Sequence, residues 1–211
     1  MPRLLELFSG TKSVSNVAKA LGWETISLDI DPKFGPDWCM DIMDFDQTQF
    51  PKNHFDFVWA SPDCRAYSSA RTNAKIPRDE AMAASDKLVA KTLQIISHFG
   101  CAYCIENPAT SRLWKRDVAD GLQCVTASYC CHDDYKYKKN TKFASNFLGK
   151  LPVCPGVGLC PQMVDKKHIE HAQRGSGGAM PREHTTDELH TIPEGLLREM
   201  FRQLNARGHG A

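Results

Sequence analysis

Short apolar segments alternate with helical patterns over the first half of the chain, and this alternation restricts the fold more than any other feature. Strands are expected at Arg3–Phe8, Glu24–Leu28, Phe55–Ala60 and Gly100–Ile105. Apolar residues recur at helical spacing in Ser13–Leu21, which Gly22 ends, and in a long amphipathic segment from Arg78 to His98. Strands alternating with helices predict an α/β fold with a doubly wound, Rossmann-like parallel sheet.

The second half of the chain loses this rhythm. Leu122–Tyr129 and Lys142–Phe147 are expected strands, and Pro193–Leu204 carries one apolar helical face. Between them, Leu151–Gly178 is rich in Gly, Pro, Cys and His and has no clear periodicity. We therefore predict three parts: a core over residues 1–147, a small Cys/His-rich insertion over residues 148–180, and a C-terminal helix within 181–211 that completes the core.

Charge and cysteine content exclude several classes of protein. With 26 Lys and Arg against 25 Asp and Glu, the formal net charge is +1, so nucleic acid would have to bind through local patches. No apolar run approaches the ~20 residues of a membrane helix, and the N-terminus lacks a secretory pattern. The nine cysteines are an odd number, and 211 residues can bury a core without disulfides. We expect reduced thiols in a cytoplasmic protein that is not secreted.

Polar residues follow three of the expected strands, at the edge where α/β sheets bind ligands. Phe8–Thr11 follows the first strand, and its glycine lets the backbone approach a ligand at a helix N-terminus. Asp29 and Asp31 follow the second strand, where a carboxylate can hold two ribose hydroxyls. Asp41 and Ile42 follow a further strand end. This pattern favours a nucleoside ligand; the alternative is that the aspartates form turns and cap helices.

A thiol and a carboxyl group follow the next two strands. Cys64 comes just after Phe55–Ala60, and Glu106 directly after Gly100–Ile105, so both are expected in one crevice. The segment between Arg65 and Arg78 contains basic and hydroxyl residues without an acid, which suits binding to phosphates. A thiolate that adds to C6 of a pyrimidine, with an acid supporting N3, makes C5 nucleophilic. The alternative is a buried structural cysteine beside an exposed basic segment.

These motifs occur in the order and spacing of the cytosine-C5 DNA methyltransferases. They are Leu7–Gly10, Asp29–Asp31, Asp41-Ile42, Ser61–Cys64 and Glu106–Pro108. The chain resembles a compact, phage-type member of this family from about Arg3 to Asn146, with a shorter similarity in the C-terminal helix. The resemblance implies a class I methyltransferase core that uses S-adenosyl-L-methionine to methylate C5 of cytosine in double-stranded DNA, with the base flipped out, in a prokaryotic or phage-infected cell.

The resemblance also assigns roles to residues. Cys64 is the implied nucleophile and Glu106 the partner of cytosine N3. The implied cofactor pocket is lined by Phe8, Ser9, Gly10, Thr11, Asp29, Ile30, Asp41, Ile42 and Pro62. The implied contacts to nucleic acid are Arg65, Ser68, Ser69 and Arg71, together with Lys139 or Lys142. Those two lysines lie in Tyr137–Asn146, where the family has a basic motif that contacts the flipped base or the backbone.

The chain departs from the family at three points. Asp63 stands where the family usually has proline, and a carboxylate beside a thiol opposes its ionisation. A single glycine is left in the first motif, where Lys12 either meets the ligand's carboxylate or faces solvent. Only residues 147–192 are available for target recognition, so a specificity partner could supply it.

Three alternative functions therefore remain in addition to DNA methylation. They are methylation of RNA cytosine, transfer of another group to a pyrimidine, and a degenerate subunit that binds nucleic acid or a partner without turnover. Asp63 favours the degenerate subunit, whereas the presence of both Cys64 and Glu106 favours an enzyme.

Cysteine and histidine recur in the insertion with the pattern Cys154-x5-Cys160-x7-His168-x2-His171. These ligand types suit tetrahedral zinc, and a loop rich in proline and glycine needs an ordering agent. Cys130 or Cys131, at the end of the preceding strand, could replace a histidine. We predict structural zinc on Cys154, Cys160, His168 and Cys130; the alternative is loosely packed thiols and surface histidines. Cys101 and Cys104 point to opposite faces of a strand and are read as core.

Overall fold

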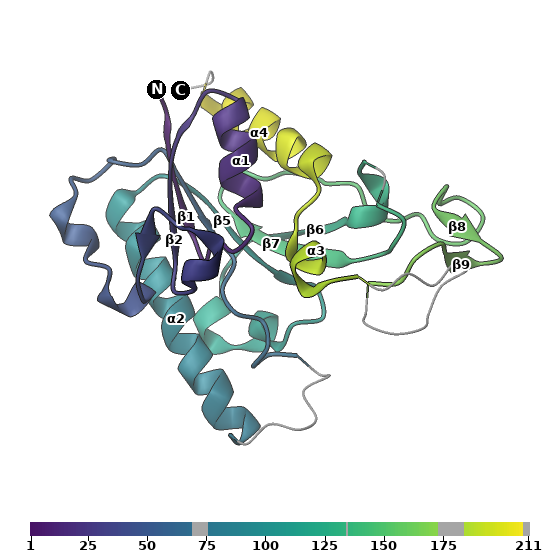
Figure 1. Ribbon diagram of the computed structural model, residues 1–211, viewed down its shortest axis with the longest axis horizontal. Coiled ribbons are helices and arrows are strands. Elements are labelled where there is room, and N and C mark those ends of the chain that lie inside the picture. The colour runs from purple at the N-terminus through teal and green to yellow at the C-terminus, as the bar shows by residue number, and fades with distance from the viewer. Residues whose placement is uncertain (69–75, 134, 173–183, 209–211) are drawn as a thin grey trace.

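The computed structural model describes residues 1–68, 76–133, 135–172 and 184–208. Its centre is a seven-stranded sheet in the order β3-β2-β1-β4-β5-β7-β6 (Figure 1). The strands are β1 (Arg3–Leu7), β2 (Glu24–Asp29), β3 (Trp38–Cys39), β4 (Phe57–Ala60), β5 (Ala102–Pro108), β6 (Cys124–Ser128) and β7 (Asn140–Ser145). The first five pair in parallel, and β7 runs antiparallel to both β5 and β6. The predicted α/β class is confirmed.

Helices cover both faces of this sheet, as in a doubly wound fold (Figure 1). They are α1 (Ser13–Ala20) and α4 (Glu194–Gly208) on one face and α2 (Arg78–Phe99) on the other. Neighbouring strand residues alternate between the two cores: Leu4 packs with α1 and α4, whereas Leu5 packs on the α2 side. Both leucines are fully buried, so the central strand is apolar on both faces.

Short elements fill the connections. The 3-10 helices are η1 (Pro32–Phe34), η2 (Ile42–Asp44), η3 (Gln47–Gln49), η4 (Arg112–Lys115), η5 (Asp117–Ala119) and η6 (Tyr129–Cys131). Two elements were not expected from the sequence. One is a hairpin of β8 (Met163–Val164) and β9 (Lys167–His168) inside the insertion, and the other is α3 (Thr186–His190), which Thr185 and Glu188 start with a capping box. Two-residue strands are too short to leave a periodic signal.

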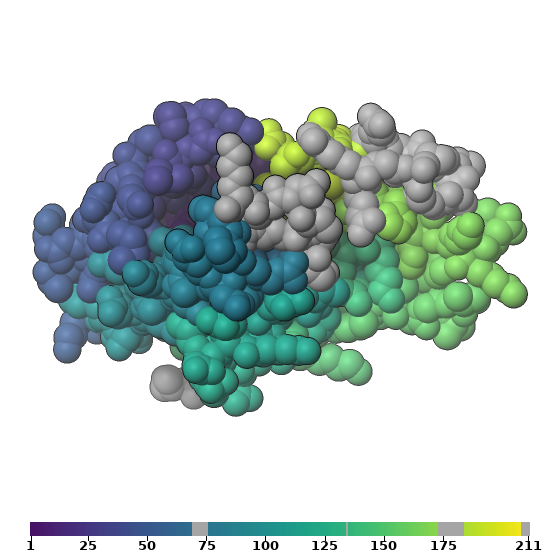
Figure 2. Space-filling view, turned by 90° about the horizontal axis from the view of Figure 1, so that it is seen from below, coloured from purple at the N-terminus to yellow at the C-terminus, as the bar shows by residue number. Residues whose placement is uncertain are grey.

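The expected strands and long helices lie within a few residues of the observed ones. The largest difference is in the C-terminal helix, expected at Pro193–Leu204 and observed at Glu194–Gly208. The described part of the insertion (green) lies at one end of the molecule, and blue segments from the first third of the chain lie at the other (Figure 2). All nine cysteines are free, and Cys104 is fully buried whereas Cys101 is half-buried. Within the described parts of the chain, no helix is long and apolar enough to cross a membrane.

A buried carboxyl group joins the central strand to the first helix. Glu6 of β1 is 3% exposed, and its carboxyl oxygens accept hydrogen bonds from the backbone N–H groups of Val14 (3.3 Å) and Ser15 (2.9 Å) at the start of α1. Burial raises the pKa of Glu6 from 4.5 to about 7, because those hydrogen bonds offset only part of the lost hydration. The folded chain thus holds a proton that the unfolded chain releases.

The first prediction concerns stability and pH. Because the pKa of Glu6 is raised in the folded state, its contribution to stability is fully present below pH 4.5 and is lost as pH rises through about 7. The loss amounts to about 3 kcal/mol at 1.4 kcal/mol per pH unit. We expect Glu6→Gln, which copies the protonated form, to flatten this fall in the free energy of unfolding between pH 5 and 8. Parallel profiles for the two proteins in urea titrations would contradict the assignment.

Candidate active site and cysteine cluster

The order of the parallel strands reverses between β1 and β4, and a pocket opens beyond their carboxyl ends. Its volume is about 300 Å³. In an open α/β sheet, such a switch point is where ligands bind. The wall is formed by Glu6, Phe8, Ser9, Gly10, Thr11, Ser13, Ser61, Pro62, Asp63, Cys64, Arg65, Glu106, Asn107, Pro108, Lys139, Thr186, His190 and Ile192. The pocket therefore gathers the ends of β1, β4 and β5 with residues from the last third of the chain.

The turn after β1 forms one side of the pocket in a strained conformation. Phe8, Gly10 and Lys12 all have positive φ angles, of 55°, 43° and 56°. Asp29 at the end of β2 accepts a hydrogen bond from the Gly10 N–H at 2.8 Å, which holds the turn in place. A side chain at Gly10 would meet open space, and the buried Ser9 hydroxyl has no partner among the described residues. Strain and an unsatisfied hydroxyl in one turn are features of a ligand-binding site.

The structure separates the residues expected to line the cofactor pocket. Phe8, Ser9, Gly10, Thr11 and Pro62 lie on its wall. Asp29, Ile30, Asp41 and Ile42 do not: Ile30 is 67% exposed and Ile42 packs in the core.

The turn-forming and helix-capping role of the aspartates is confirmed. Asp29 accepts from the backbone N–H of Asp31, Asp31 caps η1, and Asp41 caps η2. The Lys12 Nζ donates a hydrogen bond to the Gly35 carbonyl at 2.8 Å. This lysine therefore contacts a neighbouring turn and is not part of the pocket wall.

Cys64 is held on both sides by buried hydrogen bonds. The Asn107 amide of β5 donates to the Pro62 carbonyl at 2.8 Å, which joins the loop before the thiol to the next strand. After the thiol, the Tyr67 N–H donates to the Cys64 carbonyl at 3.1 Å. Tyr67 is fully buried, and its hydroxyl donates to Asp86 of α2 at 2.9 Å. The thiol therefore belongs to a fixed loop between two elements of the core.

Three ionisable groups of the pocket affect one another. Burial raises the pKa of Cys64, and the nearby charges of Glu106 and Asp63 raise it further, whereas the Lys139 ammonium lowers it. Burial also raises the pKa of Glu106, against the effects of Lys139 and of a hydrogen bond with Ser61. Burial lowers the pKa of Lys139, against the pull of Glu106 and Cys64. Lys139 is thus the cation that favours a thiolate here.

The structure distinguishes the two candidate lysines. The Lys139 Nζ donates to the Leu189 carbonyl at 2.6 Å and lies 4.8 Å from the centre of the Tyr129 ring, inside the pocket wall. The Lys142 Nζ instead lies 5.4 Å from the centre of the Trp114 ring and is absent from that wall. Lys139 is therefore the lysine placed to act on a bound base.

Two of the remaining expected contacts to nucleic acid, Arg65 and Ser68, follow Cys64 closely in the chain. Arg65 is on the pocket rim and pairs with Asp63, with distances of 2.9 Å from its Nε to both carboxylate oxygens. Arg65 thus balances part of the Asp63 charge, although Asp63 still raises the pKa of Cys64. Ser68 is half-buried. Ser69 and Arg71 lie outside the described residues.

A second group of functional side chains lies at the far end of the sheet. The ligand atoms of Cys130, Cys154, Cys160 and His168 all lie within 4.8 Å of one another. This is the set expected from the sequence, with Cys130 as the fourth member. His171 and Cys131 lie outside the cluster, and His171 is exposed. Three thiols and one imidazole in this arrangement can hold a metal ion.

Some pocket residues were missed by the sequence. Thr186, His190 and Ile192 reach the wall from α3 and the residues just after it. Their signal was the capping box of Thr185 and Glu188, which marks a helix start but not its position in space. Ser61 and Asn107 belonged to recognised motifs but had no assigned role.

The chain is similar to known methyltransferases. A probable DNA (cytosine-5)-methyltransferase of Frog virus 3 (isolate Goorha) is 28% identical over 215 residues, 94% of this chain and 98% of the relative. The solved structure of an Entamoeba histolytica methyltransferase is similar with a TM-score of 0.53 and 12% identity, covering 72% of this chain and 56% of that one, so this chain spans little more than half of it. The Schizosaccharomyces pombe Dnmt2 methyltransferase has a TM-score of 0.48 and 18% identity, covering 70% and 51%.

No family model matches the chain. The similarity in sequence to the viral relative nevertheless extends over almost the full length of both proteins, and the sheet has the fold of a methyltransferase. Both findings agree with the resemblance that the motifs indicate: this chain has the fold of a methyltransferase and is similar in sequence, over most of its length, to a probable DNA (cytosine-5)-methyltransferase.

Proposed function

We propose that this chain transfers a methyl group from S-adenosyl-L-methionine to C5 of cytosine in DNA, through a covalent bond between Cys64 and C6. The supporting observation is that one pocket combines Cys64, Glu106 and Lys139 with the strained turn after β1. The name of the viral relative supports cytosine as the base. Cys64 is the proposed nucleophile, Glu106 the proposed acid, and Lys139 the proposed cation beside them.

The turn after β1 suits the cofactor. S-adenosyl-L-methionine, when bound, supplies the electrophilic methyl group. We assign its amino-acid end to Phe8–Thr11, because the open space beside Gly10 admits a close approach of the ligand. The Ser9 hydroxyl has no hydrogen-bond partner among the described residues, so it can bind a polar group of the ligand. We propose that the nucleoside end of the cofactor lies near residues that follow the neighbouring strand ends, namely Asp29, Ile30, Asp41 and Ile42.

The side chains of the pocket perform the chemistry on the base. The Cys64 thiolate adds to C6, while protonated Glu106 donates to N3, so that electron density moves to C5. C5 would then take the methyl group as the bond between that group and the sulfonium sulfur of S-adenosyl-L-methionine breaks, which would leave S-adenosyl-L-homocysteine. Loss of the C5 proton to water and of the thiolate from C6 restores the aromatic ring, and N3 returns its proton to Glu106. The raised pKa of Glu106 favours the protonated form that this step needs.

Nucleic acid reaches the pocket from the side of the Cys64 loop. We propose that Arg65, Ser68, Ser69 and Arg71 contact phosphates, and that the target base leaves the double helix to enter the pocket. The three predicted parts then have separate tasks: residues 1–147 carry the chemistry, 148–180 form the insertion, and 181–211 complete the core and the pocket wall. A partner protein could supply sequence specificity.

The second prediction tests the reaction itself. DNA and RNA are incubated with the protein and methyl-labelled S-adenosyl-L-methionine, and the nucleosides are analysed by mass spectrometry. We expect labelled 5-methylcytosine in DNA, none with Cys64→Ala, and a loss of roughly 10²–10⁴-fold with Glu106→Gln. Label in RNA alone would replace DNA as the substrate. No label in either, with the cofactor still bound, would contradict the enzyme and favour a binding protein.

The third prediction tests Lys139 against Lys142. Lys139→Met removes the cation beside the thiol, so the pKa of Cys64 should rise. The pH dependence of alkylation at Cys64, followed by peptide mass spectrometry, measures this shift. Lys142→Met is the matched control, because its ammonium lies against Trp114 instead. Equal profiles for the two variants would remove Lys139 from the proposed mechanism.

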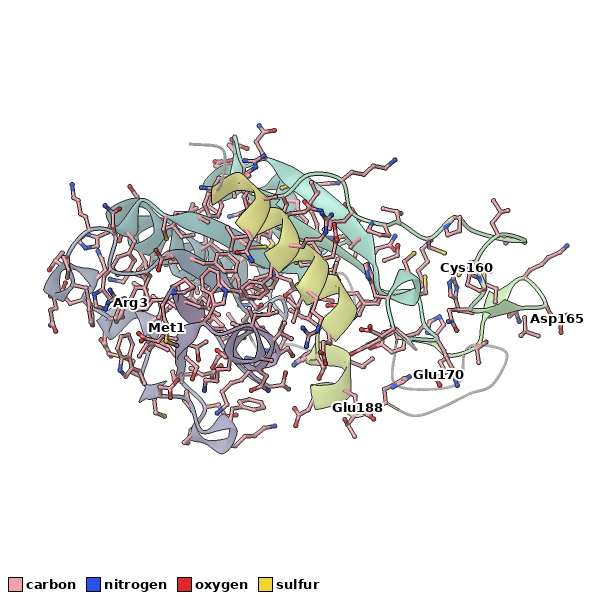
Figure 3. The ribbon with its side chains drawn as sticks, turned by 90° about the horizontal axis from the view of Figure 1, so that it is seen from above. Met1, Arg3, Cys160, Asp165, Glu170 and Glu188 are labelled. Atoms are coloured by element: carbon pink, nitrogen blue, oxygen red, sulfur yellow. The ribbon has the colours of Figure 1, made fainter. Side chains whose placement is uncertain are left out.

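The fourth prediction concerns the acid beside the nucleophile. Asp63→Asn removes a negative charge and releases Arg65, and both effects should lower the pKa of Cys64. We expect this fall in the pKa of Cys64 to be smaller in size than the rise caused by Lys139→Met, because Arg65 already balances the carboxylate. Alkylation rates against pH give the value, with Asp165→Asn at the tip of the hairpin as the control (Figure 3). A rise in the pKa would show that Asp63 supports the thiolate.

A further inference from the structure

We propose that Cys130, Cys154, Cys160 and His168 bind one zinc ion, which joins the β8–β9 hairpin and the loop before it to the end of β6. The ligands come from three places: Cys130 from η6, Cys154 and Cys160 from the loop after β7, and His168 from β9. Cys160 lies where the β8–β9 hairpin joins the rest of the protein, whereas Asp165 lies at the outer tip (Figure 3). The four ligands thus bring together segments separated by up to 38 positions in the chain.

The distances fit tetrahedral coordination. The Nε2 of His168 lies 3.5 Å from the Sγ of Cys154 and 3.6 Å from the Sγ of Cys160. With zinc bonds of ~2.3 Å to sulfur and ~2.0 Å to nitrogen, tetrahedral angles place such a nitrogen and sulfur roughly 3.6 Å apart. An imidazole nitrogen has one lone pair and cannot accept hydrogen bonds well from two thiols at once. A shared cation explains both distances.

The insertion has little apolar core to hold its shape. Val153, Val157 and Leu159 are 51%, 59% and 74% exposed, although they lie between or beside the cysteines. Ordering such a segment costs conformational entropy that hydrophobic burial does not offset here. Metal binding supplies that free energy in small loops of this kind. Three thiolates and one imidazole favour zinc over harder cations such as magnesium, which prefer oxygen ligands.

The proposed zinc site is connected to the pocket by short contacts. The Cys154 N–H donates to the Ser128 hydroxyl at 2.9 Å, and the Ser128 N–H donates to the Pro152 carbonyl at 3.0 Å. Cys130 directly follows Tyr129, whose N–H donates to the Lys139 carbonyl at 3.1 Å and whose ring faces the Lys139 ammonium. The metal therefore positions Lys139 through Tyr129. This consequence rests on the proposed function, whereas the metal site does not.

The fifth prediction is tested by metal analysis of the full-length protein. After expression with added zinc and removal of unbound metal, mass spectrometry should find about one zinc per chain. Cys154→Ser and Cys160→Ser should lose most of it. Cys124→Ser is the matched control, because this thiol is exposed on β6 and outside the cluster. Zinc retained equally by Cys154→Ser and Cys124→Ser would overturn the site, as would a wild-type protein without stoichiometric metal.

A second measurement uses wild-type protein, so that its result does not depend on whether the cysteine variants fold. Wild-type protein is treated with a mercurial reagent while a zinc-sensitive dye records release, and its melting temperature is compared with and without a chelator. We expect the mercurial to release zinc and the chelator to lower the melting temperature. Zinc release with an unchanged melting temperature after chelation would contradict a structural role for the metal. If the metal site is correct and the proposed function is not, the metal content stays stoichiometric while no methyl transfer is observed. A loss of transfer in the chelated but folded protein supports the link through Lys139.

Discussion

The position of β1 between β2 and β4 is the constraint on which the rest of the structure depends. Because both neighbours pair with it in parallel, the chain must leave β1 toward one side and return to β4 on the other. The connections that follow β1 and β4 therefore run to opposite sides, and the pocket opens between them at the carboxyl ends of the two strands. Glu6 then joins this strand to α1, so the turn between them is fixed from both ends.

The pocket combines three ionisable groups that oppose one another's charge states. A buried thiol and a buried carboxyl group both resist ionisation, and the charge of Glu106 raises the pKa of Cys64 further. The Lys139 ammonium lowers the pKa of both groups and so opposes the effect of burial. The pair of Asp63 and Arg65 keeps a further charge directed toward the rim. This balance suits chemistry in which one group loses a proton while its neighbour donates one.

The reversed strand β7 links the two functional regions. It pairs with β5, which carries Glu106, and with β6, which leads to η6 and Cys130. Lys139 directly precedes β7, so the strand that completes the sheet also delivers the cation to the pocket. The cysteine cluster lies at the other end of the same connection. A metal there would act on the reaction only through the position of Tyr129 and Lys139.

Much of this protein was predictable from local sequence. Period-two and helical patterns determine strands and helices because each element must bury one side, and ligand types determined the metal set. The sequence could not choose between Lys139 and Lys142, or place Thr186 and His190 at the pocket. Residues distant in the chain meet according to strand order and the alternation of side chains across the sheet. These are properties of the assembled fold, so only the tertiary structure decided which lysine faces Cys64.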